Sequence, residues 1–387
     1  MLMLNRLYKK IGIANMNDKL LFAFSTVLFL PILFDFITSA TGGNSSVYTY
    51  ILYIGTLIIF FMEFYIIIKL RNVFLLIGIY SLFFINSLLF PDSQYYIYST
   101  DFILVCLYFI PIGLLFFTQI RDWSSLAYIL NKYSIYAFLI GIYILLFTDV
   151  RVESKDDSLF TYMEFSYALL PFLCASFARY YETRSKFTLV LFLLGVLEIL
   201  AYGCRGAVIS TMLFVCSLIL SNGKTNRIFL FFFVAVALFV YSNFESIVNY
   251  LLSFELFSDS YFLQHFVNGE MFESSRSEIY KLCENRISSM GLEVCGVFGD
   301  RPFCGSVYPH NFVYEIMMQF GWFLGPTILL FYLALIVKCM LKRECRTALL
   351  FILCALLFKY MLSGSYLLSG LFWIASSALV SMKSSKY

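Results

Sequence analysis

Long apolar runs separated by short polar stretches make up most of this chain. A run of about 20 apolar residues forms a helix that can cross a bilayer. The runs are continuous and lack the alternation of a transmembrane barrel strand. The pattern therefore predicts an all-α polytopic membrane protein with about twelve transmembrane helices, near residues 20–38, 48–68, 73–90, 102–119, 133–149, 159–178, 187–203, 206–221, 228–244, 311–337, 347–362 and 365–382.

One long polar segment, residues 245–309, interrupts this series. It separates an N-terminal bundle of about nine helices (1–244) from a C-terminal group of about three (311–387). The apolar residues of its first part, from Ile247 to Tyr261, have helical spacing, which predicts an amphipathic helix on the membrane surface. Its last part, Gly291–Pro309, is rich in glycine and proline, so we expect an ordered but irregular loop there.

The composition agrees with a membrane protein. The chain is 61% hydrophobic and 13% charged, whereas soluble domains carry about 25% charged residues. The first apolar run follows a basic segment that begins at Arg6. Because this run is too long for a cleaved signal peptide and many others follow it, we expect a signal anchor.

The distribution of lysine and arginine predicts how the chain is oriented. With the N-terminus in the cytoplasm, 19 of the 27 Lys and Arg residues fall in cytoplasmic segments. Two loops on the other side, 39–47 and 91–101, contain none. Since cytoplasmic loops are enriched in Lys and Arg, both termini are predicted to be cytoplasmic and the loop 245–309 extracytoplasmic.

Several polar residues gather at the predicted outer face. Arg205 lies in a very short turn between two spans, where its guanidinium suits a lipid diphosphate. A snorkelling arginine is the plain alternative. Arg276 and Arg301 are further candidates, with ordinary solvated arginines of the loop as the plain alternative. Asp35 and Glu198 are acids near this face, and Glu198 would share a helix face with Arg205 if the helix continued.

The segment from Tyr308 to Glu315 opens the span after the long loop. His310 titrates near neutral pH and could remove a proton from a hydroxyl nucleophile, although a structural histidine is common at such a position. Glu315 lies one turn beyond Asn311, where a carboxylate is costly and normally has a partner or a function. Glu315 could orient His310, pair with an arginine or act as the base itself.

The cysteines allow a bridge on the outer side. Among the ten cysteines, Cys295 and Cys304 enclose a short Gly/Pro loop and are the preferred disulfide pair, with free buried thiols as the alternative. The chain has no Cys-x-x-Cys pair and its only two histidines are His265 and His310, so we expect no metal site.

At these residues the chain resembles the superfamily of O-antigen polymerases and O-antigen ligases. The shared features are the span count, the large outer loop before the last spans, Arg205 in a short outer turn, Arg276 in the loop, and His310-Asn311 opening the next span. Gly321 continues the pattern, but Leu324 stands where the family has a small residue.

The resemblance implies a GT-C-like glycosyltransferase that needs no cofactor or metal. Its donor would be a glycan on undecaprenyl diphosphate, transferred at the periplasmic face of the bacterial inner membrane. Arg205, Arg276 and Arg301 would bind the diphosphate, and His310 with Glu315 would activate the acceptor hydroxyl. Asn311, Glu198 and Asp35 would support them.

A polymerase is the expected function, and a ligase and a transporter are the alternatives. A polymerase would extend the chain on a lipid-linked repeat unit, with a chain-length regulator as a candidate partner. A ligase would transfer the polymer to lipid A–core. A multi-pass lipid or polysaccharide transporter would be expected to show repeated halves. Membrane lipids are expected partners and nucleic acid is not.

Overall fold

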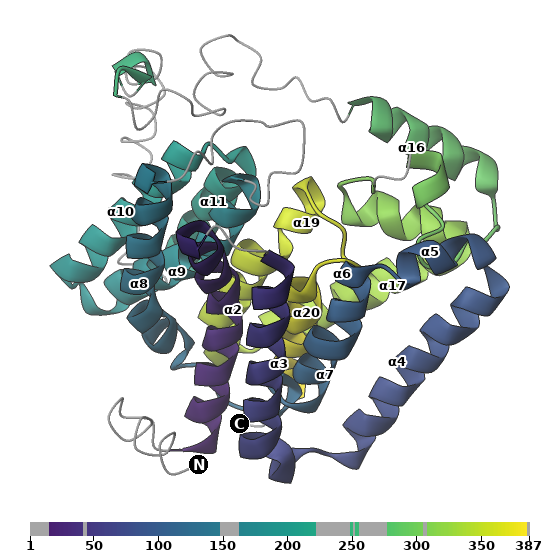
Figure 1. Cartoon of the computed structure of the whole chain (residues 1–387), viewed down its shortest axis with the longest axis horizontal. Coiled ribbons are helices and arrows are strands. Elements are labelled where there is room, and N and C mark those ends of the chain that lie inside the picture. Colours follow the sequence, from purple (N-terminus) through teal and green to yellow (C-terminus); the bar gives the residue numbers. More distant parts are fainter. Residues whose placement is uncertain are drawn as a thin grey trace.

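The computed structural model describes residues 15–41, 45–147, 162–221, 248–250, 252–254, 277–304 and 308–384. Within these ranges all regular structure is helical, as the apolar runs predicted (Figure 1). Seven helical segments are long and apolar enough to cross a membrane: Met16–Ala40, Tyr50–Ile67, Leu70–Leu89, Thr100–Gln119, Leu126–Phe147, Phe312–Met340 and Arg343–Leu362. Two further apolar helices are shorter, Arg205–Ser221 and Gly370–Lys383.

Eleven of the twelve predicted runs coincide with helices. The remaining run, 228–244, and most of the predicted surface helix 247–261 lie outside the described residues. The segment 102–119 is not one regular helix, because a π-helical turn joins two α-helices there. The main α-helices are α2 (Met16–Thr41), α3 (Ser45–Phe64), α4 (Leu70–Leu89), α5 (Gln94–Ile97), α6 (Thr100–Leu104), α7 (Ile110–Leu115), α8 (Leu126–Phe147), α9 (Tyr162–Thr183), α10 (Lys186–Tyr202), α11 (Arg205–Ser221), α16 (Ser277–Met290), α17 (Phe312–Met340), α18 (Arg346–Phe351), α19 (Lys359–Leu362) and α20 (Gly370–Ser384).

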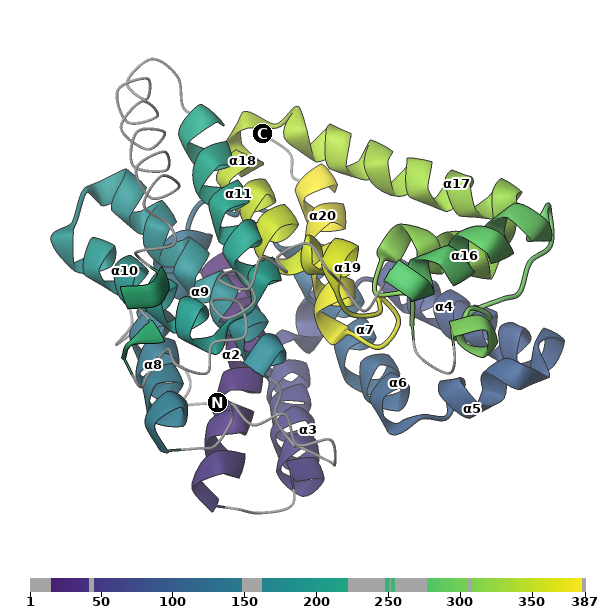
Figure 2. The same cartoon turned by 90° about the horizontal axis from the view of Figure 1, so that it is seen from above.

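The helices pack into one bundle around α9. Helices α8 and α10 lie along α9, and α2 packs against both α8 and α9 (Figure 1). On the other side, α11 joins α9 to α18 and α19, while α20 packs against α7 and α17 (Figure 2). Most buried residues are apolar, with large rings such as Phe24, Phe138 and Phe172 fully enclosed. Helix α4 is mostly exposed, as a lipid-facing helix would be.

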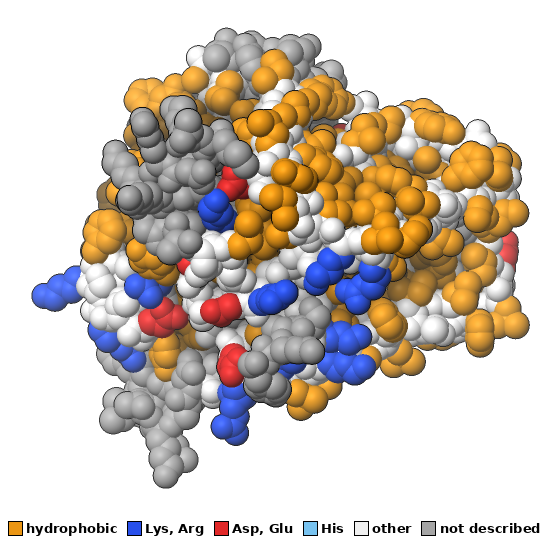
Figure 3. All heavy atoms as spheres, turned by 90° about the horizontal axis from the view of Figure 1, so that it is seen from below, with side chains coloured by type: hydrophobic (Ala, Val, Ile, Leu, Met, Phe, Trp, Pro, Cys, Tyr) orange, Lys and Arg blue, Asp and Glu red, His pale blue; other side chains and the backbone are white. Residues whose placement is uncertain are grey.

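The helix ends that the charge count assigned to the cytoplasm lie together at one end of the bundle, here called the basic end. Lys19 Nζ lies 2.5 Å from Glu63 Oε1, joining the start of α2 to the end of α3. Lys342 donates to the carbonyl of Met382, and Arg346 donates to that of Ser221. Viewed from below Figure 1, where α2 begins, Lys and Arg side chains lie beside a few Asp and Glu side chains and border an apolar region (Figure 3).

Helix α17 is broken at Gly321, where the sequence predicted one continuous span. Gly321 has φ 66° and ψ −170°, a conformation that favours glycine. A Cβ at this position would lie 2.2 Å from the carbonyl oxygen of Glu293. The loop supplies the backbone bonds lost at the break, because Gln319 O accepts from the amide nitrogens of Cys295 and Gly296, each at 3.0 Å. The loop and α17 therefore form one unit.

The long loop contains a helix, α16, that we did not predict. It lies beside α17 (Figure 2). Its buried residues Cys283, Ile287 and Met290 recur at intervals of four and three, the spacing of one helix face. This short amphipathic pattern was the signal available in the sequence. The irregular course predicted for the residues after α16 is confirmed from 291 to 300, and a short 3-10 helix follows at Arg301–Cys304.

Candidate functional site

Arg205 is held by a tight turn at the end of the bundle opposite the basic end. Helix α10 ends at Tyr202, and Gly203 adopts a left-handed conformation with φ 73° that caps it. Cys204 is buried, and Arg205 begins α11 half-buried. Because the helix does not continue through Gly203, the shared helix face considered for Glu198 and Arg205 does not exist.

Lys359 lies close to this turn. A Cβ on Gly206 would stand 1.8 Å from the hydroxyl of Tyr167, so the start of α11 and α9 are in direct contact there. Lys359 Nζ lies 5.7 Å from the centre of the Tyr167 ring and interacts electrostatically with Glu164 and Cys204. The orientation predicted from Lys and Arg places Lys359 outside the cytoplasm. A lysine within an apolar run was itself a signal, because a charge at that depth normally has a function or a partner.

An apolar groove of about 530 Å³ runs along α9, α10 and α11. Its walls reach from Leu189 and Tyr180, near the basic end, to Leu200 and Val208, on either side of the Arg205 turn. The lining is apolar except for Thr211 and the Tyr180 hydroxyl. The groove therefore suits a long hydrocarbon chain whose polar head lies near Arg205.

His310 lies just before α17, and α19 connects its turn with the Arg205 turn. Asn311 caps α17, since its Oδ1 accepts from the amide of Val313 at 2.9 Å. Its Nδ2 donates to the carbonyl of Met361 at 3.2 Å. The neighbouring Leu362 lies against Gly206, within 3.5 Å of a Cβ built there. Helix α19 thus contacts the turns that carry Arg205 and His310.

The His310 ring is half-buried and its backbone has φ 57°, which is uncommon outside glycine. Its centre lies 4.3 Å from that of the Tyr308 ring. Tyr308 in turn lies 5.4 Å from the guanidinium carbon of Arg301. These ring contacts connect His310 to a buried ionic cluster that includes Arg301 of the loop.

The ionic cluster is centred on Arg301, whose side chain is only 1% exposed. Its guanidinium bonds to the carboxylate of Asp300 and lies 3.2 Å from Glu315 Oε1. It also donates to the Ser365 hydroxyl at 3.0 Å. Burial raises the pKa of the Asp300 carboxyl, and the Arg301 cation opposes that shift. We expected Arg301 to bind a diphosphate, but here its guanidinium is occupied by two carboxylates.

Glu315 takes the arginine-pairing role among the three considered for it. Its Oε1 accepts from Arg301 and Ser365, and its Oε2 accepts from the amide of Tyr366 at 3.2 Å. Gln319 extends the network by donating to Asp300 Oδ1 at 2.6 Å. Glu315 is fully buried, and its hydrogen bonds join the loop, α17 and the segment before α20. This geometry gives no support to Glu315 as the base.

The other predicted residues are only partly brought together. Asp35, half-buried on α2, interacts electrostatically with Glu164 and so lies on the Lys359 side. Glu198 is buried between α10 and α8 against Gly141, and neither carboxylate oxygen has a hydrogen-bond partner among the described residues. Arg276 lies outside the described residues, immediately before α16.

The predicted Cys295–Cys304 bridge is absent, and both thiols are free. Cys304 lies 3.8 Å from Cys283, sulfur to sulfur, whereas the Cys295 sulfur accepts from Arg286 at 3.4 Å. The fold of the loop against α16 thus brings together a different pair. In the part of the chain described, no three His, Cys, Asp or Glu side chains lie together as a metal ion would require.

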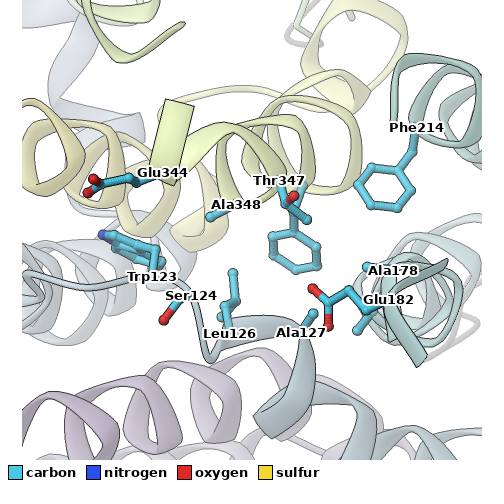
Figure 4. A pocket seen from close by; sticks show the side chains of 12 residues that line it. Trp123, Ser124, Leu126, Ala127, Ala178, Glu182, Phe214, Glu344, Thr347 and Ala348 are labelled. Carbon is cyan, nitrogen blue, oxygen red and sulfur yellow. The ribbon is translucent and has the colours of Figure 1, made fainter. Parts of the chain in front are cut away.

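A second cavity lies at the basic end and is separate from the Arg205 turn. It is formed where the segment before α8 meets α9, α11 and α18. Figure 4 shows the Glu182 carboxylate directed toward the cavity, with Trp123 and Glu344 at one side. Glu182 is paired with Arg179 of the same helix at 2.7 Å.

Comparison of the chain with protein-family models, curated proteins and solved structures found no match.

Proposed function

We propose that this chain is a membrane glycosyltransferase of the O-antigen polymerase type. It would transfer a glycan from undecaprenyl diphosphate to another lipid-linked repeat unit at the periplasmic face of the inner membrane. The observation that carries the proposal is the position of α19, which contacts the turns of Arg205 and His310 and contributes Lys359. Two cations and a candidate base then lie at one end of the bundle, where the apolar groove along α9–α11 reaches the Arg205 turn.

The donor's chemistry suits this arrangement. A polyprenyl diphosphate has a long hydrocarbon tail, for which the groove along α9–α11 offers apolar walls. Its diphosphate needs cations where negative charge develops as the glycosidic bond breaks, and Arg205 and Lys359 supply them. Arg276, as the sequence predicts, would add a third from the loop. No nucleotide sugar is required, because the lipid diphosphate is the leaving group.

In the proposed mechanism, His310 accepts the proton of the acceptor sugar hydroxyl as that oxygen attacks the anomeric carbon. The bond between the anomeric carbon and the diphosphate oxygen breaks, and the electron pair leaves with the diphosphate. Attack from the side opposite the leaving group inverts the anomeric centre. Arg301 and Glu315 do not contact the substrate in this scheme. Their contact holds the loop against α17.

Replacement of His310 tests the base. We expect His310→Asn to lower polymer formation by about 10²–10⁴-fold, the usual contribution of a general base. Asparagine tolerates the left-handed backbone that His310 adopts, so the variant should fold. The chain's other histidine provides the matched control, and His265→Ala should leave polymer at the wild-type level. Normal polymer from His310→Asn would remove His310 from the mechanism.

The function itself is tested by the lipopolysaccharide of a strain that lacks this gene. If the chain is the polymerase, the ladder on a gel collapses to core carrying a single repeat unit, because ligation still works. If it is the ligase, every repeat is lost from the core while lipid-linked polymer accumulates. An unchanged ladder would reject both O-antigen functions and favour a transporter or a role in capsule polymer.

A further inference from the structure

Two thiols are in contact on the loop side of α17. Cys283 of α16 is 0% exposed and Cys304, at the end of the short helix Arg301–Cys304, is 6% exposed. Their sulfur atoms lie 3.8 Å apart. With Ile287, Met317 and Met318 they form a small apolar cluster separate from the main core.

The two thiols differ in acidity. The hydrogen bond between the sulfurs lowers the pKa of Cys304 and raises that of Cys283. Burial and the Asp300 carboxylate oppose the lowering of the Cys304 pKa, and the Arg301 cation favours it. Since the thiolate is the reactive form in thiol–disulfide exchange, Cys304 is the sulfur suited to react first.

We propose that Cys283 and Cys304 form a disulfide that fastens α16 to the loop carrying Arg301. The distribution of Lys and Arg places this loop outside the cytoplasm, in a compartment where disulfides persist. The sulfurs lie 3.8 Å apart and would approach to about 2.05 Å in a disulfide. The inference rests on the orientation of the chain and is independent of the transferase chemistry.

The oxidant is an extracytoplasmic thiol oxidase that carries a disulfide, acting while the loop folds. The Cys304 thiolate attacks a sulfur of the oxidase and forms a mixed disulfide, releasing one oxidase thiolate. The Cys283 thiolate then attacks Cys304, and the second oxidase thiolate leaves. Two protein thiols lose two protons and two electrons, and the oxidase disulfide becomes a dithiol.

The bond would have a structural consequence for the proposed site. Arg276 immediately precedes α16, and Arg301 is bonded to Glu315 of α17. A disulfide between Cys283 and Cys304 would therefore join α16 covalently to the loop, which the Arg301–Glu315 ion pair holds against α17. Cys295 is left free, held near Arg286.

Peptide mapping tests the pair without any mutation. The full-length protein from cells is denatured, alkylated without reductant and digested with trypsin. Cleavage after Lys281, Arg286 and Lys338 places Cys283 in peptide 282–286, and Cys295 with Cys304 in peptide 287–338. We expect these two peptides to be joined, and to separate after reduction.

Two single variants identify the partner within the larger peptide. Cys295→Ser should retain the joined peptides, and Cys304→Ser should lose them. Joined peptides that persist in Cys304→Ser would assign the bridge to Cys295 and overturn the proposal. Alkylated Cys283 in the unreduced wild-type protein would also overturn it, whether all three thiols are free or Cys295 is bridged to Cys304. The lipopolysaccharide ladder is read separately, so neither failure decides the proposed function.

Discussion

Arg205→Ala is expected to abolish polymer formation while the protein still accumulates in the membrane. Arg205 starts α11 in a capped turn, close to Lys359 and to the upper end of the apolar groove. Removing one preorganised group that stabilises developing charge typically costs about 10²–10³-fold in rate. Because the turn is held by Gly203 and by the contact of Gly206 with Tyr167, the backbone should survive the change. The measurement is the amount of polymer at matched protein level.

Three further variants sharpen this result. Arg205→Lys should recover only part of the activity, since an ammonium cannot bind a phosphate through two parallel bonds. Lys359→Met should also lower polymer formation, and combining it with Arg205→Ala should cost less than the sum if both cations act on one diphosphate. Arg71→Ala, an exposed cation at the start of α4, is the matched control and should have no effect. A full ladder from Arg205→Ala would remove the diphosphate role from this residue.

Arg301→Met should destabilise the protein instead of impairing only its chemistry. The Arg301 guanidinium is 1% exposed and is paired with Asp300 and Glu315, each with a side chain 0% exposed. Its loss would leave two buried carboxylates without their cation, a change that costs about 3–5 kcal/mol. The thermal midpoint of the purified protein in detergent, and its yield from membranes, should both fall.

A control and a compensated variant test this assignment. Arg286→Met removes an arginine of α16 whose partner, Glu293, has a side chain 56% exposed, and such a pair is worth about 1 kcal/mol or less. Replacing Asp300 by Asn and Glu315 by Gln together with Arg301→Met removes all three charges and should recover much of the stability. If Arg301→Met were as stable as the wild type but inactive, the diphosphate role that we first expected for Arg301 would be restored.

The sequence was sufficient for the properties that depend on local pattern. Runs of about 20 apolar residues identified the helical segments, because every backbone polar group in a bilayer must be bonded within its own helix. The order of charged loops agrees with the grouping of α2, α3, α18 and α20 ends at the basic end. The tight turn at Gly203–Arg205 was also visible in the local sequence, because glycine readily adopts the left-handed conformation that ends a helix.

The contacts that define the site were decided by tertiary structure. Arg301 and Ser365 are 64 residues apart, and Asn86 bonds to Val297 across 211 residues. Which charge is buried against which partner depends on how such distant segments pack, and no local spacing records it. The break at Gly321 follows from the approach of Glu293, and the Cys283–Cys304 contact follows from the docking of α16. The sequence by itself determined the helices and their candidate polar ends. Packing alone decided that Glu315 pairs with Arg301 and that Lys359 lies beside the Arg205 turn. The reason is that burial and pairing depend on which side chains meet between packed helices.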